Sequence, residues 1–431
     1  MITMFGPRIR VLAYPGGKRF SFTIVDDTDG LTLETMQPTY EYLYSLGLKT
    51  TKTVWVRNPS EPATRYCDQG DTLERAEYAD YHRLLQARGF EVALHNVSSQ
   101  SNRRTEVLAG LETFRRHFGC YPKINVHHEK NRENLYFDVA QDPSRLAPTF
   151  RSRPFQSVYR AMQSLRSMVF SRVTTASSSP HGCEGERENS QYFWGDICKQ
   201  VIRYVRTNVF LNDLNALKLM PSMPVTFGDT PYVNYWFYSS NGQDVAHFNS
   251  ILSAGAIDRL EAEYGCCILY THFGMGFTVE REGRYELNSA TKQRLTAIAT
   301  KEDGWFAPAG EVLDRLLAFQ KISTYAFPGG LALRNGHSSD IASVTLVTAP
   351  HACLQVLDGR TFRANEKGLV VLPMLRTGET VILTCEHLSD DNLRWHTNDT
   401  PAWVHDAGKV LSRCIEVFRS STHRRHNAGN G

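Results

Sequence analysis

The sequence predicts a parallel α/β domain that is followed by a small antiparallel β module. From residue 19 to about 320, short apolar runs rich in β-branched residues alternate with helical patterns. These runs are nearly continuous in apolar residues, which is typical of parallel strands covered by helices. After residue 332 the chain changes to short strands separated by Gly-containing turns, with no helical pattern between them, as in an antiparallel sheet. A (β/α) barrel and a doubly wound sheet both satisfy the α/β pattern.

The α/β domain is expected to begin with regular strand–helix alternation. Its apolar runs are FSFTIV (20–25), KTTKTVWV (49–56), FEVALH (90–95), KINVHH (123–128), YVNYWFY (232–238) and CCILYTHF (266–273). Helical patterns between them include 31–47, 74–89 and 104–119. In 104–119 the apolar residues recur every three or four positions, which indicates one buried helical face. Gly47, Gly89 and Gly119 are the last residues of these three patterns, where a left-handed helix cap favours glycine.

The alternation becomes irregular in the middle of the chain. Residues 174–190 are rich in Ser, Gly and charged residues, which predicts an exposed loop. On either side of this loop, 158–170 and 196–210 have helical patterns. The expected division is a domain over 1–325 with an irregular insertion around 140–230, a β module over 332–390, and a short helix with a disordered tail over 391–431.

Length, composition and charge limit the classes of protein to which the chain can belong. The chain has 431 residues, of which 41% are hydrophobic and 11% aromatic, so it can form sizeable cores and is not disordered throughout. Its 48 Lys and Arg against 45 Asp and Glu give a net charge of +3, which argues against nucleic-acid binding. It shows no long apolar run and no secretory signal pattern, and its nine cysteines lack metal-type spacing. We therefore expect a cytoplasmic protein with reduced thiols and no transmembrane segment.

Polar side chains gather where four of the predicted strands end. These residues are Asp26 and Asp27, His95, His127 and His128, and His272. Taken singly, each has an ordinary explanation, such as a turn, a helix cap or a structural histidine. Sites in parallel α/β domains form at the carboxyl ends of the strands. The joint pattern therefore predicts an acid–base or metal site at this rim.

The segments FTIVDDTDG, RGFEVALH, ILYTHFG and GWFAPAGEVLDRLL, in this order and at these intervals, resemble the polysaccharide deacetylases of the NodB-homology class, a carbohydrate esterase type family. The likeness covers about residues 19–322 and does not extend to the β module. It implies a distorted (β/α) barrel of the polysaccharide deacetylase type. It also implies removal of acetyl groups from N-acetylated sugars with a bound divalent metal, for which we expect zinc.

The resemblance implies roles for the residues at the rim. Asp26 takes the position of the general base, and Asp27 that of the first metal ligand. His95 takes the position of a histidine ligand, and His272 that of the general acid. Ser99 stands where the family has a second histidine ligand.

The third metal ligand is therefore expected from His127 or His128. These two neighbours end the same strand, so one of them must point the other way if the strand is regular. For substrate binding we expect Asn131 and the aromatic residues Tyr136 and Trp236, because aromatic rings can stack on a sugar ring.

The expected function is that of a metal-dependent hydrolase acting on carbon–nitrogen bonds. It would remove N-acetyl groups from a sugar or glycan precursor, with metal-activated water attacking the amide carbonyl. Two alternatives stay open: hydrolysis of another non-peptide C–N bond, in a small amide or cyclic imide, and a non-catalytic carbohydrate-binding relic. Metal content separates the enzymes from the binding protein, and reaction products separate the two enzymes.

Overall fold

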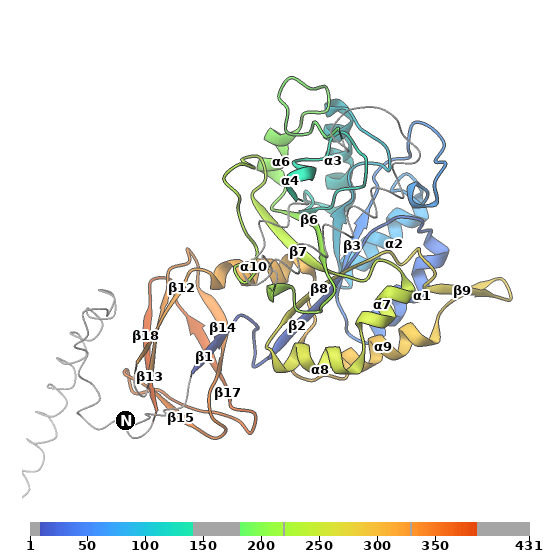
Figure 1. The fold of residues 1–431 in the computed structure, drawn as a ribbon. Helices are drawn as coiled ribbons and strands as arrows, with labels where there is room; N and C mark the ends of the chain where they lie inside the picture. The colour runs from blue at the N-terminus through green and yellow to red at the C-terminus, as the bar shows by residue number, and fades with distance from the viewer. Residues whose placement is uncertain (1–8, 141–181, 219, 328–329, 386–431) are drawn as a thin grey trace, which may run out of the picture. The chain divides into compact units, whose positions relative to one another are not determined.

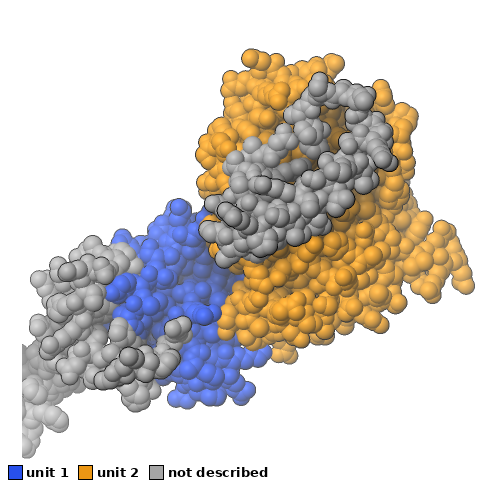
Figure 2. All heavy atoms as spheres, in the orientation of Figure 1, with its two compact units in different colours: residues 1–18, 317–431 blue, residues 19–316 orange. Residues whose placement is uncertain are grey.

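The computed structural model describes residues 9–140, 182–218, 220–327 and 330–385. The chain divides into two compact units: one is Arg19–Leu316, and the other combines Met1–Lys18 with Leu317–Gly431 (Figure 2). The helical pattern at 158–170, part of the 174–190 loop, and the helix and tail expected over 391–431 lie outside the described residues.

Seven parallel strands close into a barrel in the Arg19–Leu316 unit (Figure 1). In sheet order they are β2 (Phe20–Asp26), β3 (Thr51–Val54), β4 (Glu91–Leu94), β5 (Ile124–Asn125), β6 (Tyr204–Leu211), β7 (Tyr235–Asn241) and β8 (Cys266–Thr271). Strand β8 pairs with β2 along its whole length, and this pairing closes the ring. A two-residue strand, β11 (Gly304–Trp305), adds to the start of β2. The closure confirms the barrel over the doubly wound sheet, which is open at its edges.

The barrel is distorted at β5 and β6. Strand β5 pairs with β4 at Leu94 and Asn125 only, and the register between β6 and β7 shifts between Arg206 and Phe210. The helical pattern predicted over 196–210 is wrong for most of its length, because helix α6 (Gly195–Val201) ends and β6 begins. β6 is largely buried on both faces, and its alternating β-branched residues at 205, 207 and 209 suit a strand.

Helices surround the barrel (Figure 1). They are α1 (Leu33–Ser45), α2 (Ala76–Ala87), α3 (Arg104–Phe118), α4 (Phe137–Ala140), α6, α7 (Val245–Ile251), α8 (Ala254–Ala262), α9 (Ser289–Ala299) and α10 (Ala309–Phe319). Between them lie the 3₁₀ turns η1 (Tyr66–Asp68) and η4 (Ala216–Lys218) and the hairpin of β9 (Thr278–Arg281) and β10 (Arg284–Leu287). Gly47, Gly89 and Gly119 have φ angles of 73°, 88° and 77°, which confirms the predicted left-handed caps. No helix in the described ranges is long and apolar enough to cross a membrane.

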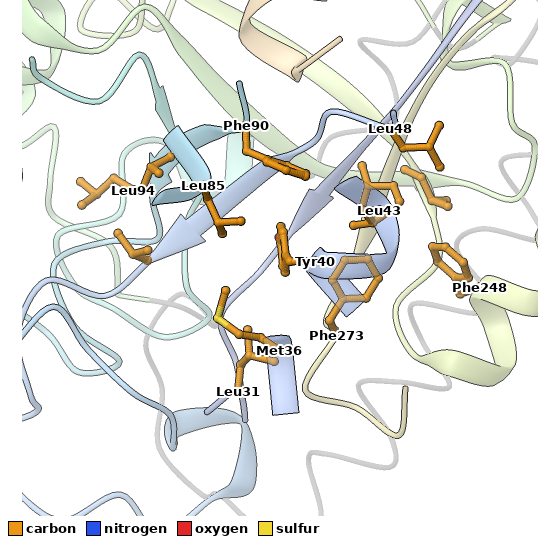
Figure 3. Close-up of a cluster of buried hydrophobic side chains, with 14 of the residues drawn as sticks. Leu31, Met36, Tyr40, Leu43, Leu48, Leu85, Phe90, Leu94, Phe248 and Phe273 are labelled. Atoms are coloured by element: carbon orange, nitrogen blue, oxygen red, sulfur yellow. The ribbon is translucent and has the colours of Figure 1, made fainter. Parts of the chain in front are cut away.

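The main core lies between the barrel wall and its helices. On α1, Met36, Tyr40 and Leu43 are fully buried (Figure 3). The ring of Tyr40 meets Phe90 and Phe273 edge to face, with centroids 5.5 and 5.9 Å apart. Burying one large apolar side chain contributes about 1.5–3 kcal/mol, so this cluster holds α1 firmly against the end of β2.

The second unit consists of two antiparallel sheets. One has the order β1-β14-β17 and the other β12-β13-β18-β15-β16. Their strands are β1 (Arg10–Leu12), β12 (Ile322–Phe327), β13 (Gly330–Asn335), β14 (Ile341–Val347), β15 (Cys353–Val356), β16 (Thr361–Arg363), β17 (Leu369–Leu375) and β18 (Thr380–Cys385). Leu333, Val344 and Leu372 belong to one core that both sheets share. The antiparallel module is thus confirmed, and β1 is an addition that three residues could not reveal in the sequence.

Candidate metal and acid–base site

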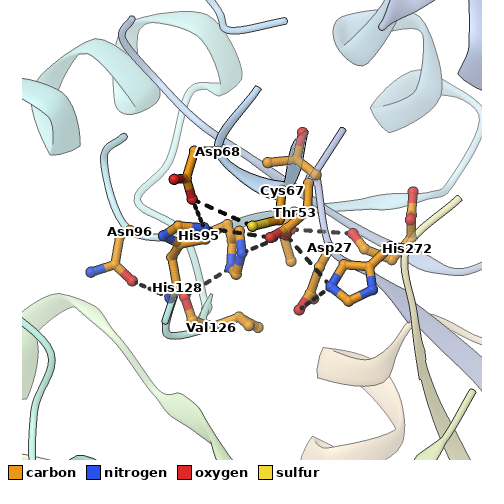
Figure 4. A network of polar contacts seen from close by, with 12 residues as sticks. Asp27, Thr53, Cys67, Asp68, His95, Asn96, Val126, His128 and His272 are labelled. Carbon is orange, nitrogen blue, oxygen red and sulfur yellow. Dashed lines mark hydrogen bonds and ion pairs between the residues drawn. The ribbon is translucent and has the colours of Figure 1, made fainter. Parts of the chain in front are cut away.

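The ends of four barrel strands bring five ionisable side chains together (Figure 4). Asp27 and Asp29 follow β2, His95 follows β4, His128 follows β5 and His272 follows β8. All five are buried. The rim of the barrel therefore holds a cluster where the strand ends predicted one, and Asp29 joins it although it reads as part of a turn in the sequence.

Asp26 lies on the other side of the barrel wall from this cluster. Its Oδ2 is 3.1 Å from Lys52 Nζ and accepts a hydrogen bond of 2.9 Å from the Tyr40 hydroxyl. Its Oδ1 accepts the backbone N–H of Phe273 at 2.8 Å. Burial raises the pKa of Asp26, although Lys52 and the two other hydrogen-bond donors oppose this. Because neighbouring strand residues point to opposite faces, Asp26 joins α1 to the wall, whereas Asp27 faces the cluster.

Three of the clustered residues have their ligand atoms directed at one another. Asp29 Oδ2 is 2.9 Å from His95 Nε2, and Asp29 Oδ1 is 3.4 Å from His128 Nε2. Burial alone would raise the pKa of Asp29, but the charges of His95 and His272 and the hydrogen bonds from the histidines lower this pKa well below its usual range. One carboxylate oxygen and two imidazole nitrogens form a donor set that suits zinc and similar divalent cations.

Hydrogen bonds to the opposite ring nitrogens prepare both histidines to bind a cation. His95 Nδ1 is 3.2 Å from the carbonyl oxygen of Val126, which can only accept, so Nδ1 carries the proton. His128 Nδ1 is 3.2 Å from Asn131 Oδ1. The Asn131 amide nitrogen is engaged by the carbonyl oxygens of Ser98 and Gln100, both at 3.0 Å, so its oxygen faces the ring. Each Nε2 is thus left with a lone pair, which is the usual second-sphere arrangement of metal-binding histidines.

The contact of both Nε2 atoms with Asp29 supports a cation at this position. Without a cation, the His128 imidazole would need a second proton to face the carboxylate. Burial disfavours that charge, yet the hydrogen bond and charge of Asp29 raise the pKa of His128 to about 9. A bound cation would supply the positive charge that Asp29 requires, so the residues present fit a metal ion.

His127 lies outside the cluster. Its Nε2 accepts the backbone N–H of Leu135 at 3.3 Å, and its ring lies near Phe137 and Trp236, with centroids 6.0 and 6.3 Å away. Burial lowers the pKa of His127 to about 3. Of the two adjacent histidines, the structure therefore brings His128 and not His127 to Asp29.

Asp27 is held by an arginine that the sequence did not single out. Arg206 on β6 makes two contacts with its carboxylate, Nη1–Oδ1 at 2.8 Å and Nη2–Oδ2 at 2.5 Å. Both side chains are buried. The guanidinium also lies 4.5 Å from the ring of Tyr270 and 5.4 Å from that of Phe210. Asp27, Asp29 and His272 are close enough to form a second metal-binding group, but Arg206 already supplies the positive charge beside Asp27.

His272 faces both aspartates from β8. Its Nδ1 donates to the carbonyl oxygen of Gln243 at 2.7 Å, so Nε2 is the nitrogen that faces the cluster. Nε2 is 3.6 Å from Asp29 Oδ2, 4.0 Å from Asp27 Oδ2 and 3.2 Å from the Tyr270 hydroxyl. Nε2 of His272 and the carboxylates of Asp27 and Asp29 thus face one another at the rim of the barrel.

The residues expected to bind substrate occupy different places. Trp236 is fully buried, and its indole N–H donates to Thr230 Oγ1 at 3.0 Å. Asn131 is buried behind His128. Tyr136 is partly buried, and its backbone N–H donates to Glu186 Oε2 at 3.0 Å. In this structure Trp236 belongs to the core, and Asn131 supports His128.

Comparisons with known proteins find similarity in the backbone fold. No family model and no curated protein sequence matches the chain. Among solved structures, a protein from Mycobacterium smegmatis assigned as a polysaccharide deacetylase is 11% identical, with a TM-score of 0.39 over 74% of this chain and 96% of that one. Puue allantoinase is 11% identical, with a TM-score of 0.38 over 71% and 93%. The carbohydrate deacetylase Agd3 is 9% identical, with a TM-score of 0.40 over 87% and 66%.

Two of these three structural neighbours are named deacetylases, the class that the sequence resembles, and the third is an allantoinase. At 9–11% identity the likeness is one of backbone fold. The barrel rests on the strand pairing described above, and the chemistry has to be argued from the site.

Proposed function

We propose that the chain is a metal-dependent hydrolase that removes N-acetyl groups from a sugar or glycan precursor. The observation that carries this proposal is the convergence of three buried ligand atoms, from Asp29, His95 and His128, beside a carboxylate and a histidine. Three protein ligands with an open position are typical of catalytic zinc, so we propose zinc as the metal. The sequence resemblance of residues 19–322 supports an N-acetylated sugar as the substrate.

Asp29, His95 and His128 would hold the metal, which when bound would polarise the amide carbonyl and lower the pKa of a water molecule to about 7. Asp29 contributes the negative charge of the ligand set. The Nδ1–H groups of the two histidines stay on Val126 and Asn131, so both rings remain oriented with Nε2 toward the site.

Asp27 and His272 would move the protons. Asp27 Oδ2 lies on the cluster side of the barrel, and would accept a proton from the attacking water. Arg206 fixes both carboxylate oxygens, so that Asp27 cannot swing toward the metal site. His272 Nε2, 4.0 Å from Asp27 Oδ2, would protonate the departing amine nitrogen, which is a poor leaving group without a proton.

These roles differ from those implied by the sequence resemblance at the two aspartates. There Asp26 is the base and Asp27 a ligand, whereas we propose Asp27 as the base and Asp29 as the ligand. The reason is the strand alternation: Asp27 and Asp29 are on the cluster side, and the Asp26 carboxylate is occupied by Lys52 and Tyr40.

Metal analysis combined with product analysis tests the proposal. The purified protein should bind about one zinc ion and release acetate and a free amine from N-acetylated sugars. Asp29→Asn should lose the metal and the activity together, whereas Asp27→Asn should keep the metal and slow turnover by roughly 10² to 10⁴. Turnover of a cyclic imide or ureide, without acetate release from any sugar, would contradict the proposed substrate. Full metal occupancy in Asp29→Asn would contradict the ligand set.

A further inference from the structure

A buried carboxylate, Glu133, lies two hydrogen bonds away from the imidazole of His128. Its Oε1 accepts from the amide nitrogens of Asn96, Asn102 and Asn131, at 3.1, 3.1 and 3.0 Å. Its Oε2 accepts from the backbone N–H of Asn102 at 3.0 Å. Glu133 and the three asparagines are each at most 3% exposed. A carboxylate buried this deeply is costly unless it is hydrogen-bonded, and these four donors meet that requirement.

The surroundings of Glu133 suit the carboxylate better than the carboxylic acid. Burial raises the pKa of Glu133, and the hydrogen bonds from Asn102 and Asn96 oppose this rise. A carboxylic acid would have to donate its proton, but the four groups that contact the side chain are themselves N–H donors. An ionised Glu133 can only accept, and this decides which way the neighbouring amides point.

The amides of Asn131 and Asn96 turn their nitrogen atoms toward Glu133 and their oxygen atoms toward His128. Asn131 Oδ1 is 3.2 Å from His128 Nδ1, and Asn96 Oδ1 accepts the backbone N–H of His128 at 2.8 Å (Figure 4). An Asn131 amide turned over would set its oxygen against the carboxylate and donate an N–H to Nδ1. The proton of the neutral imidazole would then have to lie on Nε2, where it blocks a metal ion.

Asn96 connects both histidine ligands to this carboxylate. It follows His95 directly in the chain and has a φ of 52°, a left-handed conformation that asparagine adopts more readily than most residues. With this backbone turn its side chain reaches the backbone of His128, and its amide nitrogen donates both to Glu133 and to Asn134 Oδ1. One side chain therefore links the strand end of His95 to that of His128.

We propose that Glu133 is a positioning residue that fixes the tautomer and the direction of His128 through Asn131 and Asn96. This inference rests on the ligand set of the proposed function and adds to it a carboxylate that does not touch the metal. Donation to a negative charge polarises the Asn131 amide, which makes its oxygen a better acceptor for the Nδ1–H of His128. Removing such outer partners of metal-binding histidines typically lowers metal affinity 10- to 100-fold.

The test measures metal affinity by chelator competition and records the visible spectrum of the cobalt-substituted protein. Glu133→Gln keeps the size of the side chain but removes the charge and one acceptor oxygen. It should lower metal affinity roughly 10-fold and change the cobalt spectrum. In the Asn131→Leu protein the connection is already cut, so Glu133→Gln should there lower the affinity by less than about 3-fold. Losses that multiply in the double variant, or a Glu133→Gln protein with wild-type affinity and spectrum, overturn the inference.

Glu91 provides a matched control on β4, the strand that leads to His95. Burial raises the pKa of Glu91 as well, and its Oε2 accepts from the Thr51 hydroxyl at 2.6 Å and from the Gly310 N–H at 2.9 Å. It lies at the start of β4, at the opposite end from the site. Glu91→Gln should lower the free energy of unfolding in urea and leave the cobalt spectrum unchanged. Equal spectral changes in the two glutamine variants would indicate a general loss of stability and overturn the positioning role.

Metal binding and acetate release are separate measurements, so this inference and the proposed function can fail independently. A protein that binds cobalt and shows the coupling of Glu133 with Asn131, but releases no acetate, contradicts the function and supports the positioning role. Acetate release together with an unchanged metal site in Glu133→Gln overturns the positioning role alone. A wild-type protein that binds neither zinc nor cobalt overturns both.

Discussion

Asp26 and Asp27 are adjacent but have different surroundings, so substitution by asparagine should reduce stability at Asp26 and turnover at Asp27. Asp26 and Lys52 form an ion pair at 3.1 Å, and both side chains are fully buried. Asp26→Asn leaves the Lys52 ammonium buried without its carboxylate, which should lower the free energy of unfolding by about 3–5 kcal/mol. The folded fraction should keep its metal and most of its turnover. Asp27→Asn should instead leave metal bound and slow turnover by roughly 10² to 10⁴.

Urea unfolding, metal content and kcat, measured side by side, distinguish the two aspartates. Lys52→Met combined with Asp26→Asn removes the stranded charge, so the double variant should lose less than the sum of the two single losses. Turnover must be measured under conditions where each variant is folded. Our reasoning is refuted if Asp26→Asn loses more than about 10² in kcat while its unfolding curve stays close to that of the wild type.

Three further predictions concern other parts of the barrel. Burial lowers the pKa of His82 to about 3, which is below the value in the unfolded chain. The contribution of His82 to the free energy of unfolding is therefore complete above about pH 6.5 and is lost as the pH falls toward 3, by about 1.4 kcal/mol per pH unit. His82→Leu should make the free energy of unfolding, measured with urea, less dependent on pH in this acid range, and an unchanged dependence would exclude His82 as its source. A Cβ at Gly274 would lie 2.5 Å from the carbonyl oxygen of Asp29, whereas one at Gly228 meets nothing within 4 Å; Gly274→Ala should therefore weaken metal binding in a chelator competition, and equal affinities in the two alanine variants would contradict this. Asn131→Leu removes the acceptor of His128 Nδ1 and should lower metal affinity roughly 10- to 100-fold and change the visible spectrum of the cobalt-substituted protein. Asn134→Leu loses bonds to the His128 carbonyl oxygen and to Asn96 Nδ2, neither of which involves an imidazole, and should leave the spectrum unchanged.

Local sequence patterns predicted the barrel well because its strands are short apolar runs with polar residues at their ends. They could place Asp27, His95, His128 and His272 at one rim, since the carboxyl ends of parallel strands meet there. Alternate residues of a strand point to opposite faces, so Asp26 and Asp27 should face opposite sides of the barrel wall. The resemblance nevertheless gives both a role in the site, because they are adjacent in the motif. His128 could not be chosen over His127 because β5 is only two residues long, and the direction of each ring depends on tertiary packing.

Arg206 shows why part of the site could not be predicted. It contacts Asp27 across 179 positions in the chain, and it lies on a strand whose sequence pattern predicts a helix. The one available signal was a charged residue inside a run of alternating β-branched residues, which is costly to bury unless a partner is present. Trp236 illustrates the converse: an aromatic residue in a strand is more often core than binding surface, and its indole is satisfied by Thr230.

The pairing of β1 with β14 has a consequence for biosynthesis. Arg10 to Leu12 find their partners at Thr345 to Val347, and the Thr345 hydroxyl reaches back over 331 positions to the carbonyl oxygen of Tyr14. At a synthesis rate of about 5–20 residues per second, the first strand leaves the ribosome roughly 15 to 65 seconds before its partner. During that interval the whole barrel sequence is synthesised and can fold, while β1 remains without its partner strand. Of the parts of the chain that the structure describes, the two-sheet unit is therefore the last to be assembled, and its edge at β14 is protected only when both ends of this connection have been translated.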